Sequence, residues 1–257
     1  MTAVPTPAAR TRGRDAARAL AAELSKLVSL PATWLTLGGA AAVNLILTFA
    51  FALAGLRGAT GTTSAVDIGL ASIGYTQAGF VVLGVLAACS EYDGGQIRTT
   101  LTAMPRRALQ LTAKHLAVVI VVLPAAAITA ASGVVVATGV LGDTAAPMTP
   151  GRVAGALSGA TGCLVLTTSI GTAVGALVRR TLAAVVVLLG YFFVAGPLLR
   201  DHTPVARYLP DSAGFALWFP AADEAGAVTP AQGALLLTAW AIVSIVAAVS
   251  AYHRRDV

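Results

Sequence analysis

The chain has 257 residues, of which 57% are apolar and 11% are charged, and its mean hydropathy is +0.82. Soluble domains are about 45–50% apolar and about 25% charged, so this composition excludes an ordinary soluble domain. The abundance of Val, Leu, Ile and Ala also excludes a disordered chain. The formal net charge is +6, and its meaning depends on where the positive side chains lie.

A polar region precedes the first long apolar stretch. Residues 1–15 lack apolar periodicity and are expected to form a disordered cytoplasmic tail, followed by a single membrane domain over residues 16–257. From Ala16 to Leu30, apolar residues recur at helical spacing. The apolar set is Leu20, Leu24, Leu27 and Val28, and the polar set on the other faces is Arg18, Glu23, Ser25 and Lys26. This pattern predicts an amphipathic helix on the membrane surface, ended by Pro31.

Six apolar stretches follow, and each is long enough to cross a bilayer, which takes about 20 helical residues. None has Asp, Glu, Lys or Arg in its interior, where such a charge costs about 2.5–3.5 kcal/mol. The predicted spans are 34–54, 68–89, 116–140, 153–178, 181–199 and 231–252. The expected fold class is therefore all-α, a polytopic membrane protein with six transmembrane helices.

The distribution of basic residues predicts the orientation. With the N-terminus in the cytoplasm, 13 of the 17 Lys and Arg residues fall on that side; the four outside are Arg57, Arg152, Arg200 and Arg207. Cytoplasmic loops of membrane proteins carry such an excess. Both termini are expected in the cytoplasm and the chain in the cell membrane. The bilayer accounts for the basic charge, so nucleic acid is not an expected partner.

The polar segment 90–115 lies between the second and third spans, on the predicted cytoplasmic side. Ile97, Leu101, Met104 and Ala108 fall on one face of a helix, which Pro105 should break or kink. A short basic-edged amphipathic helix of this kind suits either a lipid surface or a groove in a soluble partner. Periodicity alone leaves both open.

This segment resembles the first cytoplasmic loop of type 2 permeases of ATP-binding-cassette (ABC) transporters. The residues that carry the resemblance are Glu91-Tyr92-Asp93-Gly94-Gly95-Gln96-Ile97-Arg98-Thr99-Thr100-Leu101, then Pro105-Arg106-Arg107 and Lys114. Glu23–Ser29, followed by Thr33 and Trp34, is similar to the elbow helix that leads into the first span of these permeases. Pro31 and Ala32 depart from the basic residue that many relatives carry there. The excess of Arg over Lys, 15 to 2, looks like an actinobacterial coding bias.

The resemblance implies that energy comes from another polypeptide. In that family two permeases, identical or homologous, pair above two ATPase subunits that hold ATP and Mg²⁺. The loop between the second and third spans is the coupling helix, which docks on the ATPase. The coupling residues implied here are Glu91, Gly95, Arg98, Thr99, Thr100, Leu101, Pro105, Arg106, Arg107 and Lys114. Because the sequence has no G-x-x-x-x-G-K-[ST] phosphate loop, the chain is expected to bind no cofactor and not to be an enzyme. An exporter is the expected function.

Polar side chains at membrane depth are candidates for a substrate path. They are Asn44, Tyr75, Gln77 and Tyr191. Because a buried amide in lipid needs a partner, these residues should face the protein or a cavity. Hydrogen bonding between helices is the alternative role. Segment 200–230 places Phe215, Leu217, Trp218 and Phe219 in an interfacial or re-entrant piece at the outer surface, with an outer gate as a further possibility.

Small residues recur every four positions in the fourth span. They are Gly151, Gly155, Gly159, Cys163, Thr167, Gly171 and Gly175. A ridge of small side chains lets helix backbones approach closely, so it predicts tight packing, with a sliding surface between two states as the alternative.

Two other function classes stay open. An ion-coupled secondary transporter would more naturally carry a charged residue within a span, and the predicted spans have none. A non-transporting structural or immunity protein fits the same topology. His115, His202 and His253 fall outside the predicted span interiors, so neither a metal site nor an intramembrane enzyme is expected.

Overall fold

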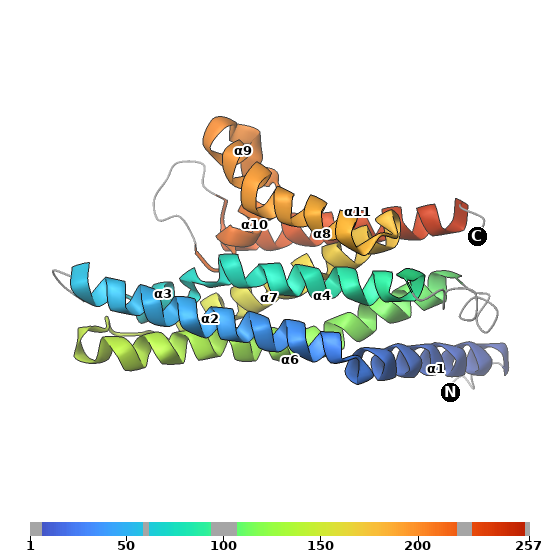
Figure 1. Ribbon diagram of the computed structural model, residues 1–257, viewed down its shortest axis with the longest axis horizontal. Coiled ribbons are helices and arrows are strands. Elements are labelled where there is room, and N and C mark those ends of the chain that lie inside the picture. The colour runs from blue at the N-terminus through green and yellow to red at the C-terminus, as the bar shows by residue number, and fades with distance from the viewer. Residues whose placement is uncertain (1–6, 59–61, 94–106, 220–227, 255–257) are drawn as a thin grey trace, which may run out of the picture.

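The computed structural model describes residues 7–58, 62–93, 107–219 and 228–254, which form an all-helical bundle (Figure 1). Six helical segments in this part of the chain are long and apolar enough to cross a membrane, as the sequence predicts. Their bounds are Pro31–Gly58, Ala65–Ser90, Leu109–Thr144, Pro150–Val178, Thr181–Arg200 and Pro230–Ala251.

The amphipathic helix and the first span meet at a sharp junction. Helix α1 (Pro7–Ser29) ends just before Pro31, where α2 (Pro31–Gly58) begins, as predicted. The Trp34 indole N–H donates to the Val28 carbonyl at 2.8 Å and fixes the turn. Helix α1 begins at Pro7, so residues 7–15 are helical rather than part of the expected tail.

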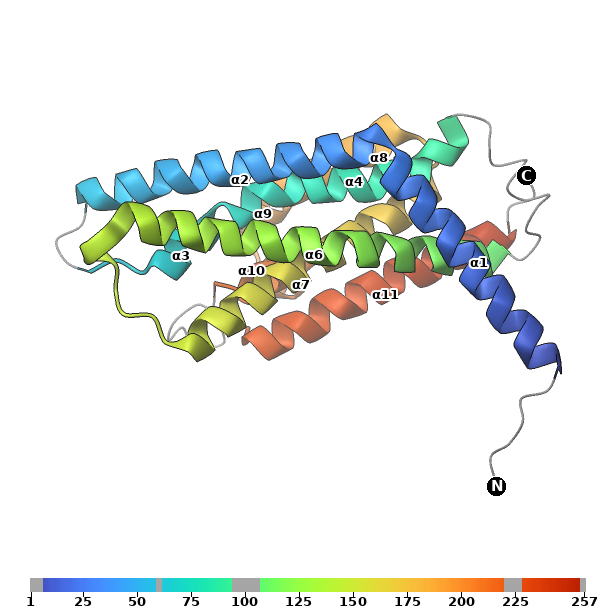
Figure 2. The same cartoon turned by 90° about the horizontal axis from the view of Figure 1, so that it is seen from below.

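The second and third spans differ in regularity. The second is divided at Ser72 into α3 (Ala65–Ala71) and α4 (Ile73–Asp93). The third is one long helix, α6 (Arg107–Leu141), which contains Pro124 and continues into a short 3-10 turn, η1 (Gly142–Thr144). Figure 2 shows α1 crossing α6 near the start of α6.

The fourth span is helix α7 (Pro150–Val178), and Arg179 ends it in the left-handed conformation, with φ of 59°. The fifth span is interrupted: α8 (Thr181–Gly190) passes into a π-helical turn, η2 (Tyr191–Ala195), and then α9 (Gly196–His202). A 3-10 turn, η3 (Pro204–Tyr208), and helix α10 (Pro210–Ala216) lead toward α11 (Pro230–Arg254), the sixth span.

Helix α7 lies at the centre of the bundle, against α4, α6 and α11. Its small-residue ridge makes this possible. A Cβ atom added to Gly171 would lie 2.7 Å from the Val81 carbonyl oxygen of α4, and one added to Gly159 would overlap the Leu217 carbonyl. The ridge positions Gly151 and Gly155 face open space. The predicted tight packing is therefore confirmed for the middle of the ridge. The first two ridge positions, Gly151 and Gly155, make no such contact.

The bundle has two distinct ends. At the first, the loop end, α4 ends at Asp93 and α6 begins at Arg107. A small apolar cluster joins α4, α6, α7 and α11 near it and consists of Ala88, Leu111, Ala173, Ala176 and Ala248. Helix α1 and the C-terminal part of α11 lie at this same end (Figure 1 and Figure 2).

The opposite end, the far end, is closed by connections between helices. Thr63 and Ala145 form an isolated β-bridge, in which Thr63 N donates to Thr144 O at 2.9 Å. Arg152 of α7 donates two hydrogen bonds to the Asp67 carboxylate of α3, at 2.9 and 2.8 Å. Because both groups are partly exposed, this ion pair orients the helices more than it stabilises them.

The packing of the ridge predicts that a Gly→Ala substitution changes the thermal stability differently at different ridge positions. Gly171→Ala should lower the thermal midpoint of the purified chain in detergent, since an overpacked contact costs about 1–3 kcal/mol. Gly155→Ala is the matched control and should hold or raise the midpoint, because Ala is the better helix former and has room there. Equal losses for both variants would contradict the packing of α7 on α4.

Candidate functional site

Most of the predicted coupling residues lie outside the described residues. These are Gly95, Arg98, Thr99, Thr100, Leu101, Pro105 and Arg106. Glu91 belongs to the last turn of α4 and Arg107 is the first residue of α6, so the two helices bring both ends of the segment to the loop end. The structure describes neither of these two side chains.

Lys114 is the predicted coupling residue whose contacts the structure describes, and its side chain turns into the fold. Its ammonium group lies 2.6 Å from Glu23 Oε2 of α1 and donates to the Ala87 carbonyl of α4 at 3.2 Å. The side chains of Lys114 and Glu23 are 7% and 1% exposed. Lys26, one turn along α1, also reaches Glu23, at 3.2 Å.

This ion pair corrects two expectations. Glu23, expected on the polar face of α1, lies on its buried stripe between Ala19 and Leu27. Lys114, expected to face the partner subunit, holds α1 and α4 to α6 instead. The physical reason is that a buried carboxylate requires a cation, and α6 supplies one about two turns after its start. The pair therefore ties the amphipathic helix to both helices that flank the predicted coupling segment.

Asn44 is at the centre of a buried polar cluster between α2, the α3–α4 break and α6. Its amide nitrogen donates to the Thr129 carbonyl at 3.0 Å, and its oxygen accepts a hydrogen bond from Ser72 Oγ at 2.8 Å. Thr48 shares a 2.8 Å hydrogen bond with Ser72, and Thr76 contacts the Asn44 oxygen at 3.4 Å. Asn44 is fully buried, so its role is hydrogen bonding between helices and not the lining of a path.

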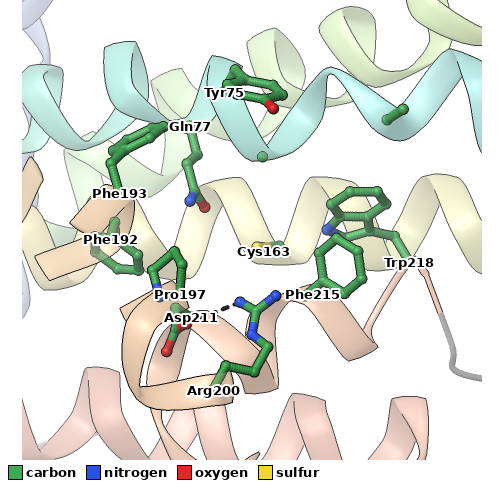
Figure 3. Close-up of a pocket in the computed structure, with 12 residues that line it drawn as sticks. Tyr75, Gln77, Cys163, Phe192, Phe193, Pro197, Arg200, Asp211, Phe215 and Trp218 are labelled. Atoms are coloured by element: carbon green, nitrogen blue, oxygen red, sulfur yellow. Dashed lines mark hydrogen bonds and ion pairs between the residues drawn. The ribbon is translucent and has the colours of Figure 1, made fainter. Parts of the chain in front are cut away.

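A cavity of about 360 Å³ lies between α4, η2, α9 and α10 (Figure 3). This volume is within the range of small-molecule sites, about 300–1,000 Å³. Tyr75 and Gln77, two of the predicted path residues, are in its wall. Much of the remaining wall is aromatic and consists of Phe192, Phe193, Phe215 and Trp218.

Asp211 anchors the polar side of this cavity. Its side chain is 3% exposed and accepts a hydrogen bond from Arg200 Nη2 at 2.9 Å. The Tyr191 hydroxyl donates to the other carboxylate oxygen at 3.1 Å. Tyr191, the fourth predicted path residue, is therefore not a wall residue itself but contacts one, Asp211. Gly196 leaves room for the carboxylate, because a Cβ there would lie 2.6 Å from it. Arg200 also stacks over the Phe215 ring, 5.3 Å from its centroid.

Backbone irregularities place these groups together. Tyr191 starts the π-helical turn η2, and such turns are frequent at functional sites because they redirect side chains. Helix α10 enters the bundle beside the ridge of α7: a Cβ on Gly214 would lie 3.0 Å from Cys163 Sγ. The aromatic segment after α10 thus packs against the bundle, and Trp218 is 4% exposed.

The buried ion pair generates a stability prediction. Lys114→Met should lower the unfolding free energy by about 3–5 kcal/mol, because it leaves the Glu23 carboxylate without its main cation. Adding Glu23→Gln to that variant should restore much of the loss. Lys26→Met is the control and should cost less than about 1 kcal/mol, since that cation is 38% exposed. Thermal unfolding of the four purified proteins measures this; a larger loss for Lys26→Met than for Lys114→Met would contradict it.

A scan of protein-family models gives no match for this chain, and a search of curated proteins finds none either.

Proposed function

We propose that the chain is the transmembrane permease subunit of an ABC exporter, in the cell membrane, with both termini in the cytoplasm. A separate ATPase subunit binds and hydrolyses ATP-Mg²⁺ and docks on residues 90–115, and a second permease completes the passage. The observation that carries the proposal is the buried pair between Glu23 and Lys114. It joins the amphipathic helix to the two helices that enter and leave the segment with the ABC permease resemblance.

Helix α4 provides a physical route from that segment to the cavity. Its last turn leads into the proposed coupling residues, and its first turns carry Tyr75 and Gln77 in the cavity wall. A helix moves as a rigid element, so displacement at the loop end shifts one wall of the cavity. ATP then drives transport through its different affinity for the two states of the assembly.

An ion-coupled carrier is the second candidate, and Asp211 is the residue that would serve it. This carboxylate is buried beside the cavity, where a proton or sodium site would need one. Arg200, however, lies 2.9 Å away and supplies a fixed positive charge. The carboxylate is already neutralised by a side chain, which favours a structural ion pair over a coupling-ion site.

The docking segment is tested by association with a candidate ABC ATPase subunit. Arg98→Glu and Leu101→Asp should abolish co-purification and the stimulation of ATP turnover, since they alter the charge and the apolar stripe of the docking helix. Arg180→Gln, an exposed basic residue next to α7, is the control and should preserve both. If both docking variants retain association and stimulated turnover, the permease assignment is wrong.

Substitution of the two amide side chains, Gln77 and Asn44, distinguishes a residue of the substrate path from one that only holds helices together. Gln77→Leu should change ATP turnover of the reconstituted complex while leaving its thermal midpoint intact, because Gln77 faces the cavity. Asn44→Leu should lower the midpoint by the equivalent of about 1–2 kcal/mol, because Ser72 and the Thr129 carbonyl lose their partner. The reverse outcome would exchange the roles given to the two residues.

A further inference from the structure

The cavity combines an apolar wall with one buried hydrogen-bond donor that has no acceptor among the described residues. The Trp218 indole is buried, and its N–H makes no hydrogen bond to any described residue. Its polar neighbour is the Cys163 thiol, which is a weak acceptor. Gln77 of α4 and Arg200 of α9 extend toward one another from opposite walls (Figure 3). A buried donor without an acceptor is costly, so this site favours a ligand that brings one.

The charges of the site define the ligand's head group. Arg200 and Asp211 neutralise each other, so the wall offers donors without a net charge. An anionic head would lie near the buried Asp211 carboxylate, and a cationic head would meet the Arg200 guanidinium. A neutral group with a hydrogen-bond acceptor, such as an ester or an amide carbonyl, suits this wall best.

The position of the cavity defines the rest of the ligand. Tyr75 and Phe193 are wall residues from two spans, and they are 55% and 37% exposed on the side of the bundle. Arg200 is the last residue of the fifth span, near the far end. The cavity wall therefore includes Arg200, at the end of the fifth span, and two partly exposed aromatic side chains from the second and fifth spans. A molecule with a polar head and one apolar chain fits that orientation and can enter from lipid.

We propose that this cavity binds a neutral, single-chain amphiphile, with its head at Gln77, Arg200 and Trp218 and its chain between Tyr75 and Phe193. The substrate class of the exporter follows from this, and in that respect the inference rests on the proposed function. Binding itself needs no ATPase. It can therefore be measured on the permease alone, so that failure to bind and failure to couple are separate results.

The test uses Trp218 as the reporter. Trp34→Phe with Trp240→Phe removes the other two indoles, which are 56% and 39% exposed, and leaves the buried one. The purified full chain in nanodiscs is titrated with 2-bromoethyl undecanoate, whose bromine is on the ester head and quenches an indole that the head contacts. Saturable quenching is expected. Undecanoate and undecyl-trimethylammonium, with anionic and cationic heads on the same chain, should compete about tenfold more weakly than methyl undecanoate.

Matched glycine variants separate the cavity from the lipid-facing surface. A Cβ atom added to Gly74 would have no neighbouring atom within 4 Å, so Gly74→Leu can place its side chain in the cavity and should abolish saturable quenching. Gly39 of α2 has the same free space at its Cβ position but lies outside the cavity wall, so Gly39→Leu should preserve the quenching. Gln77→Leu should weaken binding about tenfold and provides a second variant if Gly74→Leu does not fold. Equal quenching in all variants would overturn the site, and tighter binding of either charged probe would overturn the ligand class.

Discussion

The close approach of α7 to its neighbours is the constraint on which the rest of the structure depends. In lipid, apolar side chains gain little by leaving their surroundings, so helices associate where small residues let backbones touch. Along one ridge of α7, Gly159 contacts the segment after α10, Gly171 contacts α4, and Gly175 contacts α4 again near Cys89. The same ridge thus positions the segment after α10 beside the cavity and holds the part of α4 that leads into the predicted coupling segment.

The charged and polar groups inside the bundle are then of two kinds, those that have a partner on another helix and those that are available to a ligand. Glu23 with Lys114, and Asn44 with Ser72, satisfy each other inside the bundle and hold helices together. In the cavity the buried N–H of Trp218 has no such partner among the described residues, and Gln77 lies in the cavity wall. This contrast is why we assign packing to the first groups and ligand binding to the cavity.

The spans could be predicted because each is a long run without interior charge, and the ridge of α7 could be predicted from its four-residue repeat. The role of Glu23 could not, because helical spacing placed it on a polar face and only α6 supplies the cation that buries it. Asp211 and Arg200 were missed as a pair: eleven positions separate them, and the π-helical turn and the fold of α10 that join them leave no periodic signal. The available signals were the Gly196-Pro197 step shortly before Arg200 and Pro210 directly before Asp211, because both mark an irregular backbone.

The central proposal is that the segment 90–115 faces the cytoplasm and binds a separate ATPase, and thiol labelling tests it most directly. Both native cysteines are buried, so a single added cysteine can be labelled against a low background. The test variant is Arg98→Cys, and Arg57→Cys, at an exposed position of the far end, is the control. With a membrane-impermeant maleimide, we expect Arg98→Cys to react in inverted vesicles alone and to be protected by the ATPase, whereas Arg57→Cys reacts in right-side-out vesicles. Labelling of Arg98→Cys from the outside, or without protection by the ATPase, would contradict the account.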